Sequence, residues 1–257
     1  MMSRDFGAVA EALRRSTVHV RDGGSGVIWR SDGLIVTNAH VARSKHHRVE
    51  LWDGRLLDAT VAKRDPRRDL ALLHADLRDA PVVRPRDSSG LRAGEIAIAV
   101  GNPLGFTGAL STGVIHGHGP LRGLGRQNWV QADIRLAPGN SGGPLADAEG
   151  RVVGINTMVA GGLALAVPSN TVEAFAAETN DRASLGVTIR PVEPGLLVLE
   201  VEPDSPAARA SLFPGDILTG ISVEELYDAI ETRDTLRLHF RRGGDRRVRE
   251  VAIRLAA

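Results

Sequence analysis

The chain has 257 residues, of which 42% are hydrophobic and 25% are charged, and its formal net charge is +1. This composition is typical of a globular protein with one large or two smaller domains. The near-zero net charge excludes a protein that binds nucleic acid or an anionic membrane through its overall charge. The chain contains no cysteine, which excludes disulfides, thiolate chemistry and cysteine-ligated zinc.

The first 20 residues, MMSRDFGAVAEALRRSTVHV, lack the apolar core of a secretory signal because Asp5 and Glu11 interrupt them. No run approaches the roughly 18 apolar residues of a membrane-spanning helix. We therefore expect no membrane span. We also expect a cytoplasmic location if the chain is full length, and a periplasmic or other extracytoplasmic one if a leader has been removed. Residues 5–15 are a helix candidate within an N-terminal segment, 1–16.

Residues 17–167 consist of short apolar or alternating runs separated by Gly, Pro, Asn and Asp. Trp29 to Gly33 and Trp52 to Arg55 have the Asp-Gly pairs that are typical of hairpin tips. Many short strands with regular turn signals predict an all-β barrel or sandwich. The second helix candidate of this part covers residues 168–180, where Val172, Phe175 and Ala176 share one face.

The composition changes after Asn180, and we place a domain boundary near residues 180–183. The remaining chain predicts two strands, a turn with a short helix, a strand, a second helix, and then a strand, a hairpin and a final strand. Ser222 can cap the second helix, whose apolar face contains Val223, Leu226, Tyr227 and Ile230. The predicted domains are therefore residues 17–180 and 183–257.

Ser141 stands in the glycine-rich stretch QADIRLAPGNSGGPL, residues 131–145. A serine hydroxyl becomes a nucleophile only with an adjacent base and with rigid N–H donors for the developing oxyanion. The amides of Gly139 and Ser141 could supply those donors, since glycine lets a substrate carbonyl approach closely. Taken alone, a glycine-rich loop with a serine is more often a turn than the site of a nucleophile.

Two further residues complete a candidate triad. His40 follows the apolar run LIVT, and Asp69 immediately precedes the apolar run LALL. Taken alone, a histidine at the end of a strand is usually structural, and an aspartate at the start of a strand is as readily a turn residue. Their chain order of histidine, aspartate and serine, however, is that of the double-barrel serine proteases and differs from that of subtilisins and of α/β-hydrolases.

The motifs GSGVIWRSDGLIVTNAHV, DLALL, AVGNPLGFTGALSTGVI, QADIRLAPGNSGGPL and LALAVPSN resemble those of the HtrA (Deg) serine proteases. The resemblance covers about residues 15–180. It implies a mainly β protein in which a trypsin-like double six-stranded β-barrel is followed by a small α+β PDZ domain. It assigns His40 as general base, Asp69 as the residue that orients it, and Ser141 as nucleophile.

The resemblance also implies binding residues for the substrate. Gly139, Asn140 and Ser141 form the expected oxyanion hole. Asn140 is uncharged and cannot pair with an ammonium freed by zymogen cleavage, so we expect no activation by propeptide removal. An apolar S1 pocket for a small P1 residue is expected from four residues: Leu136, Asn156, Thr157 and Met158.

In the C-terminal part, SLGVTI resembles the carboxylate-binding loop of a PDZ domain. Backbone amides of Leu185, Gly186 and Val187 are then expected to hold the C-terminal carboxylate of a peptide that adds as a strand. Ile221 runs straight into the helix, so the connection that usually contains an Asn-Gly turn is shortened. A role as a docking or spacing module therefore stays open.

The leading hypothesis is an ATP-independent endopeptidase of protein quality control and stress response that degrades unfolded or damaged protein. The alternatives are a peptide-binding chaperone or scaffold with a resting inactive protease domain, and a hydrolase of small esters. We expect no cofactor and no metal, since His116 and His118 lack convergent carboxylates. The family also implies a homotrimer built through N-terminal segments, in which Phe6 is the one aromatic residue.

Overall fold

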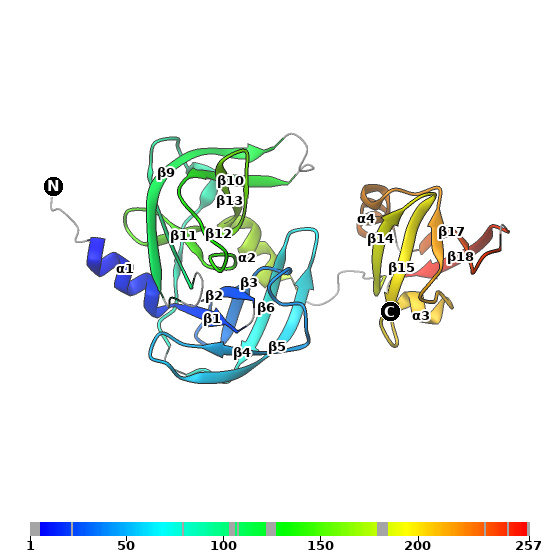
Figure 1. Ribbon diagram of the computed structural model, residues 1–257, viewed down its shortest axis with the longest axis horizontal. Helices are drawn as coiled ribbons and strands as arrows, with labels where there is room; N and C mark the ends of the chain where they lie inside the picture. Colours follow the sequence, from blue (N-terminus) through cyan, green and yellow to red (C-terminus); the bar gives the residue numbers. More distant parts are fainter. Residues whose placement is uncertain are drawn as a thin grey trace. The chain divides into compact units, whose positions relative to one another are not determined.

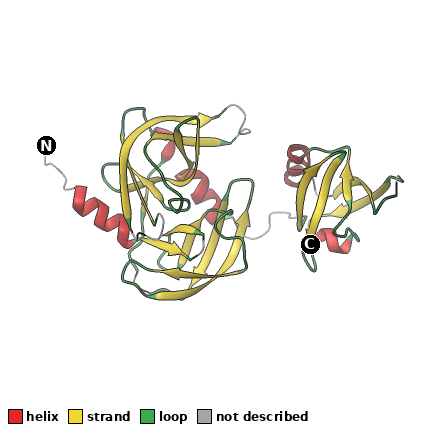
Figure 2. Cartoon of the chain, in the orientation of Figure 1, coloured by secondary structure: helices red, strands yellow, loops and turns green. Residues whose placement is uncertain are grey.

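The computed structural model describes residues 6–21, 23–78, 80–102, 106, 108–121, 127–178, 185–233, 235–245 and 247–255. The chain divides into two compact units, Met1–Ala177 and Glu178–Ala257 (Figure 1). The boundary predicted near residues 180–183 lies outside the described residues. Strands predominate in both units, as the sequence predicts (Figure 2).

The first unit begins with helix α1 (Phe6–Arg15) and a closed six-stranded barrel in the order β1-β2-β3-β6-β5-β4. Its strands are β1 (Thr17–Val20), β2 (Gly24–Ile28), β3 (Leu34–Thr37), β4 (His46–Glu50), β5 (Leu56–Asp65) and β6 (Leu70–Ala75). Both predicted hairpin tips are confirmed, because residues 29–33 join β2 to β3 and residues 51–55 join β4 to β5.

A second ring of six strands follows, in the order β11-β8-β9-β10-β13-β12, and it is closed by the pairing of β11 with β12. The strands are β8 (Ile96–Gly101), β9 (Ala109–Pro120), β10 (Asn128–Asp133), β11 (Pro144–Ala146), β12 (Arg151–Ala160) and β13 (Leu163–Pro168). The short strand β7 (Arg84–Pro85) runs parallel to β12, and a 3₁₀ turn, η1, covers Ser88–Gly90. The double six-stranded barrel expected from the sequence is confirmed.

Alternating side chains explain why so many of these strands are apolar throughout. In β3, Ile35 points into the first barrel, while Leu34 and Val36 join a cluster shared with the second barrel. In β8, Ile98 and Val100 join the same shared cluster. Successive side chains of a strand face opposite sides, so a strand buried on both sides is apolar at every position.

Helix α2 (Ser169–Ala177) closes the first unit. Val172 and Phe175 are fully buried in the shared cluster, and Ala176 packs against it, as its predicted apolar face requires. Trp29 Nε1 donates to Glu173, and Lys63 Nζ donates to the carbonyl of Phe175. These two contacts fasten α2 to the first barrel as well as to the second.

The second unit is a five-stranded antiparallel sheet in the order β14-β15-β16-β17-β18, with two helices. Its elements are β14 (Val187–Val192), β15 (Gly195–Val201), α3 (Pro206–Arg209), β16 (Ile217–Thr219), α4 (Val223–Thr232), β17 (Thr235–Arg241) and β18 (Arg249–Arg254). Ser222 and Glu225 form a capping box at the start of α4, and Leu226 is buried. The predicted order of elements is confirmed.

Candidate active site

Local turns present His40 at the end of strand β3. The carbonyl of Asn38 accepts the amides of Val41 and Ala42, so the chain makes one helical turn directly after the strand. Asn38 is fully buried, whereas the His40 side chain is 42% exposed. The imidazole is therefore held on a rigid base and is open to solvent.

Asp69 lies immediately before β6 with a positive φ of 51°. This left-handed conformation is uncommon for residues other than glycine, and Asp and Asn tolerate it best. The Asn38 side-chain amide donates to the carbonyl of Asp69 at 2.9 Å, which secures the turn. The turn aims the carboxylate at the residues that follow β3.

The carboxylate of Asp69 contacts both the ring and the backbone amide of His40. Its Oδ2 lies 2.8 Å from His40 Nδ1, and its Oδ1 accepts the backbone amide of His40 at 3.0 Å. The Thr157 hydroxyl also donates to Oδ2. Because a carboxylate accepts hydrogen bonds, Nδ1 of a neutral His40 carries the proton and Nε2 is left as an acceptor.

Ser141 lies in the loop between β10 and β11. Its hydroxyl donates to the carbonyl of Thr157 at 2.9 Å. Among the described residues, no hydrogen bond joins Ser141 Oγ to His40. Thr157 thus contacts the candidate nucleophile through its carbonyl and the candidate orienting carboxylate through its hydroxyl.

Three consecutive carbonyls of the loop are held in place. The Gly139 carbonyl accepts the Ser25 hydroxyl at 2.7 Å, the Asn140 carbonyl accepts the Gly143 amide at 3.0 Å, and the Ser141 carbonyl accepts the Ser25 amide at 2.8 Å. In the part of the chain that the structure describes, the amides of Gly139 and Ser141 have no hydrogen-bond acceptor. Two donors therefore remain for an external oxygen.

The glycines of this loop are required by close packing against strand β2 of the first barrel and strand β8 of the second. A Cβ on Gly142, whose φ is +85°, would lie 2.0 Å from the carbonyl oxygen of Ser25. A Cβ on Gly143 would lie 2.3 Å from the carbonyl oxygen of Val100. Both distances are far below normal contact, so only glycine fits.

The residues predicted to form the S1 pocket differ in their surroundings. Leu136 is half-buried and packs on the interior cluster of the second barrel, and Met158 is 38% exposed on β12. Asn156 is fully buried, and its side-chain amide donates to the carbonyls of Gly143 and Pro144. The assignment of these residues to substrate specificity stays a prediction.

The predicted carboxylate-binding residues of the second unit lie at the start of β14. Leu185 is buried, and its carbonyl accepts the amide of Ala207. Gly186 has a φ of +69°, and its carbonyl accepts the amide of Glu202. Val187 begins β14, which is an edge strand because β15 is its only partner among the described strands.

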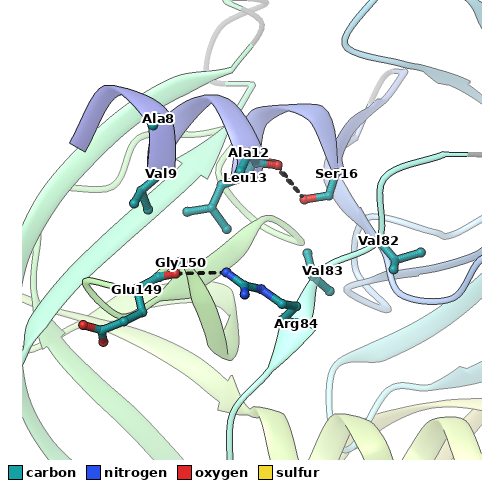
Figure 3. Close-up of a pocket in the computed structure, with 10 residues that line it drawn as sticks. All are labelled: Ala8, Val9, Ala12, Leu13, Ser16, Val82, Val83, Arg84, Glu149 and Gly150. Atoms are coloured by element: carbon teal, nitrogen blue, oxygen red, sulfur yellow. Dashed lines mark hydrogen bonds between the residues drawn. The ribbon is translucent and has the colours of Figure 1, made fainter. Parts of the chain in front are cut away.

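A cavity of about 310 Å³ in the first unit lies between helix α1 and the segments around Val83 and Gly150 (Figure 3). Val9 and Leu13 supply part of its lining, which includes none of His40, Asp69 and Ser141. No cluster of three or more potential metal ligands occurs among the described residues. In the same part of the chain, no helix is long and apolar enough to cross a bilayer.

Comparison with known proteins shows similarity to serine proteases. Residues 24–155 match the model of a trypsin-like peptidase domain. Serine protease HTRA1 of Xenopus laevis is 35% identical over 86% of the chain and 58% of its own length. A probable periplasmic serine endoprotease DegP-like of Brucella suis is 35% identical over 80% of the chain and 45% of its own length.

The chain belongs to the HtrA/DegP family of serine proteases. A putative serine protease HhoB of Synechocystis is another relative, 34% identical over 86% of the chain and 63% of its own length. This HtrA-family chain therefore spans roughly half to three-fifths of the length of the curated relatives named here.

Solved HtrA-type structures show the same fold. The HtrA-type protease AlgW with a tripeptide matches with a TM-score of 0.66 and 27% identity, over 98% of this chain and 97% of that one. AlgW with a decapeptide matches with a TM-score of 0.59 and 29% identity, over 91% and 82%. The C-terminal sheet with its helices is consistent with the PDZ domain expected in this family.

Two contacts of this HtrA-family site were not predicted from the sequence. The hydroxyl of Thr157 contacts Asp69, although Thr157 was predicted only as a specificity residue. Ser25 contacts the loop of Ser141 from 114 residues away along the chain. The sequence signal for Ser25 is its place between two glycines in GSG, where a strand passes close to another backbone.

Proposed function

We propose that this chain is an ATP-independent serine endopeptidase that cleaves unfolded or damaged protein. Ser141 is the nucleophile, His40 the general base and Asp69 the carboxylate that orients it. The observation that carries the proposal is the 2.8 Å contact between His40 Nδ1 and Asp69, beside a loop with two unpaired amides. A carboxylate bound to Nδ1 fixes the tautomer that leaves Nε2 as a base.

The first half of the reaction follows from these positions. The Ser141 hydroxyl turns from the Thr157 carbonyl to Nε2 of His40 and gives up its proton there as Oγ attacks the substrate carbonyl carbon. The π electrons of the carbonyl move to its oxygen, which the amides of Gly139 and Ser141 stabilise. His40 then donates the proton to the leaving nitrogen as the peptide bond breaks.

Water completes the second half. His40 takes a proton from the water molecule as its oxygen attacks the acyl carbon, and Ser141 leaves with that proton. Asn140 shapes the loop because its amide donates to the carbonyl of Ala137 at 3.0 Å and its carbonyl accepts Gly143. Leu136, Asn156, Thr157 and Met158 define a preference for a small apolar P1 residue.

The PDZ-like unit assists engagement of the substrate. Amides at Leu185, Gly186 and Val187 hold a peptide C-terminus, and the peptide adds to the open edge of β14. The chain assembles as a homotrimer, which static light scattering tests directly.

One observation favours a second candidate, a peptide-binding chaperone whose protease domain is inactive at rest. The Ser141 hydroxyl is bound to Thr157 rather than to His40, and a serine without its base is a weak nucleophile. The two candidates differ in whether substrate brings Ser141 and His40 together.

Digestion of β-casein separates the two candidates. We expect the wild-type chain to cleave casein and Ser141→Ala to lose the activity by more than about 10³-fold. Ser44→Ala is the matched control, because Ser44 is exposed and lies outside the site. Equal casein cleavage by wild type and Ser141→Ala contradicts the proposal, and binding of unfolded protein without cleavage supports the chaperone. Cleavage of small esters alone supports the esterase.

A further inference from the structure

Ser25, in strand β2 of the first barrel, uses every hydrogen-bonding capacity of its hydroxyl. It donates to the carbonyl of Gly139 at 2.7 Å and accepts two bonds from Asn102, at 2.9 Å from the backbone amide and at 3.3 Å from Nδ2. A hydroxyl has one donor and two acceptor sites, so this one has no alternative orientation. Ser25 is fully buried, and these bonds are therefore shielded from water.

Asn102 is itself fixed in one orientation. Its Oδ1 accepts the backbone amide of Gly108 at 2.9 Å, so its Nδ2 must face Ser25. Asn102 is 2% exposed and follows directly after strand β8. The direction of the Ser25 hydroxyl is thus determined by a second buried residue of the other barrel.

The backbone of Ser25 is held as firmly as its side chain. Its amide donates to the carbonyl of Ser141 at 2.8 Å, and its carbonyl accepts the Thr37 hydroxyl at 2.6 Å. Ser25 consequently holds the carbonyls on both sides of Asn140, one with its hydroxyl and one with its amide. The peptide between Gly139 and Asn140 is held at its other end by the bond from the Asn140 amide to Ala137.

We infer that Ser25 is a positioning residue for the oxyanion hole. A peptide plane that is held through its carbonyl does not rotate freely. The next plane along the chain, Asn140–Ser141, contains the Ser141 amide, so the direction of that amide depends on the Gly139–Asn140 plane. Without the Ser25 hydroxyl, the Gly139 carbonyl loses its only partner among the described residues, and the Gly139–Asn140 peptide plane is then held only through the Asn140 amide. The inference rests on the proposed function, since it concerns the same oxyanion.

The inference predicts a specific kinetic defect. Donors aimed at the oxyanion act on the transition state and not on the bound substrate, so Ser25→Ala should lower kcat and leave KM almost unchanged. Loss of one oxyanion donor costs about 10²–10³-fold in kcat, and misplacement of a donor should cost between about 10-fold and that limit. A peptidyl boronic acid, which forms a tetrahedral adduct on serine, should lose affinity by the same factor.

The test compares Ser25→Ala with Ser169→Ala in the full chain. Ser169 is also a buried serine whose hydroxyl donates to a backbone carbonyl, that of Arg86, and it lies outside the site. The substrate is a chromogenic peptide with alanine or valine at P1, and the melting temperature is measured for each variant. We expect both variants to melt below the wild type, and only Ser25→Ala to lose kcat and boronate affinity.

Unchanged kcat and boronate affinity in a folded Ser25→Ala variant would overturn the inference, as would a rise in KM alone. A wild type without activity would instead refute the proposed function. If Ser25→Ala does not fold, Asn102→Ala replaces it, because it removes one of the two bonds that orient the same hydroxyl, the one from Nδ2, without deleting the hydroxyl. That variant should lose about 3- to 10-fold in kcat at constant KM, the effect of one hydrogen bond, and an unchanged kcat there contradicts the inference.

Discussion

At the scale of single residues, Asp69 combines a left-handed backbone conformation with a carboxylate that binds both His40 and Thr157. Its φ of 51° is a conformation in which Asp and Asn are the tolerated non-glycine residues. Its carboxylate accepts bonds from the His40 ring, the His40 amide and the Thr157 hydroxyl. The charge can therefore be removed without disturbing the turn that presents it.

Replacement of Asp69 by Asn removes the charge and keeps a residue that tolerates the turn. The amide of Asn cannot accept the Nδ1 proton in the same way and favours the wrong tautomer of His40, so we expect kcat to fall by about 10⁴-fold. The melting temperature should stay close to that of the wild type. Asp58→Asn, at a carboxylate that is 96% exposed, is the control. Retention of full activity by Asp69→Asn would show that the carboxylate has no catalytic part.

At the scale of elements, strand β14 has a proline on its open edge. Val192 and Gly195 flank a two-residue turn, and Pro191 is opposite Leu196 in the next pair. Pairs in an antiparallel ladder alternate between bonded and non-bonded, so the nitrogen of Pro191 faces away from β15. Proline has no N–H, and the edge therefore lacks a donor there.

This edge limits the length of a peptide that can add to it. C-terminal peptides of three to eight residues should gain affinity up to about four residues and then no further, since the ladder stops at Pro191. Pro191→Ala should extend the gain to longer peptides and leave the affinity of the three-residue peptide unchanged. Fluorescence anisotropy measures both series. A wild-type affinity that rises through eight residues contradicts the limit, and no binding at any length contradicts the PDZ assignment.

At the scale of the whole molecule, an ion-pair network joins the ends of several segments of the first unit. Arg86 lies 2.6 Å from Glu95 and 3.2 Å from Asp147. The hydrogen bond from Arg86 lowers the pKa of Glu95 to about 2, with a further contribution from Arg92. A carboxyl whose pKa is lower in the folded state stabilises the fold above its unfolded pKa and loses that stabilisation as the pH falls.

The stability of the first unit should accordingly fall between about pH 4.5 and pH 2, the interval between the unfolded and folded pKa of Glu95. Glu95→Gln removes the titrating group. We expect this variant to be less stable than the wild type at pH 7 and to depend less on pH in that interval. Urea unfolding at a series of pH values measures both slopes, and identical slopes would refute the role of Glu95.

Local patterns in the sequence were enough to predict the strands, both helices of the first unit and the three candidate catalytic residues. Helix α2 ends at Ala177, three residues before the predicted end, because helix ends depend on caps more than on apolar spacing. The contacts of Thr157 with Asp69 and of Ser25 with Gly139 were not predictable. They join residues 88 and 114 positions apart, and no local pattern specifies such pairs.

The distribution of the candidate triad over two barrels has a consequence for biosynthesis. His40 and Asp69 belong to the first barrel, whereas Ser141 and the carbonyl that Ser25 holds belong to the second. A ribosome releases the chain from its N-terminus, so the proposed base His40 is synthesised before the proposed nucleophile Ser141 has been translated. On the proposed function, the nascent chain therefore cannot cleave itself or its neighbours until Ser141 has been added and the second barrel has folded beside the first.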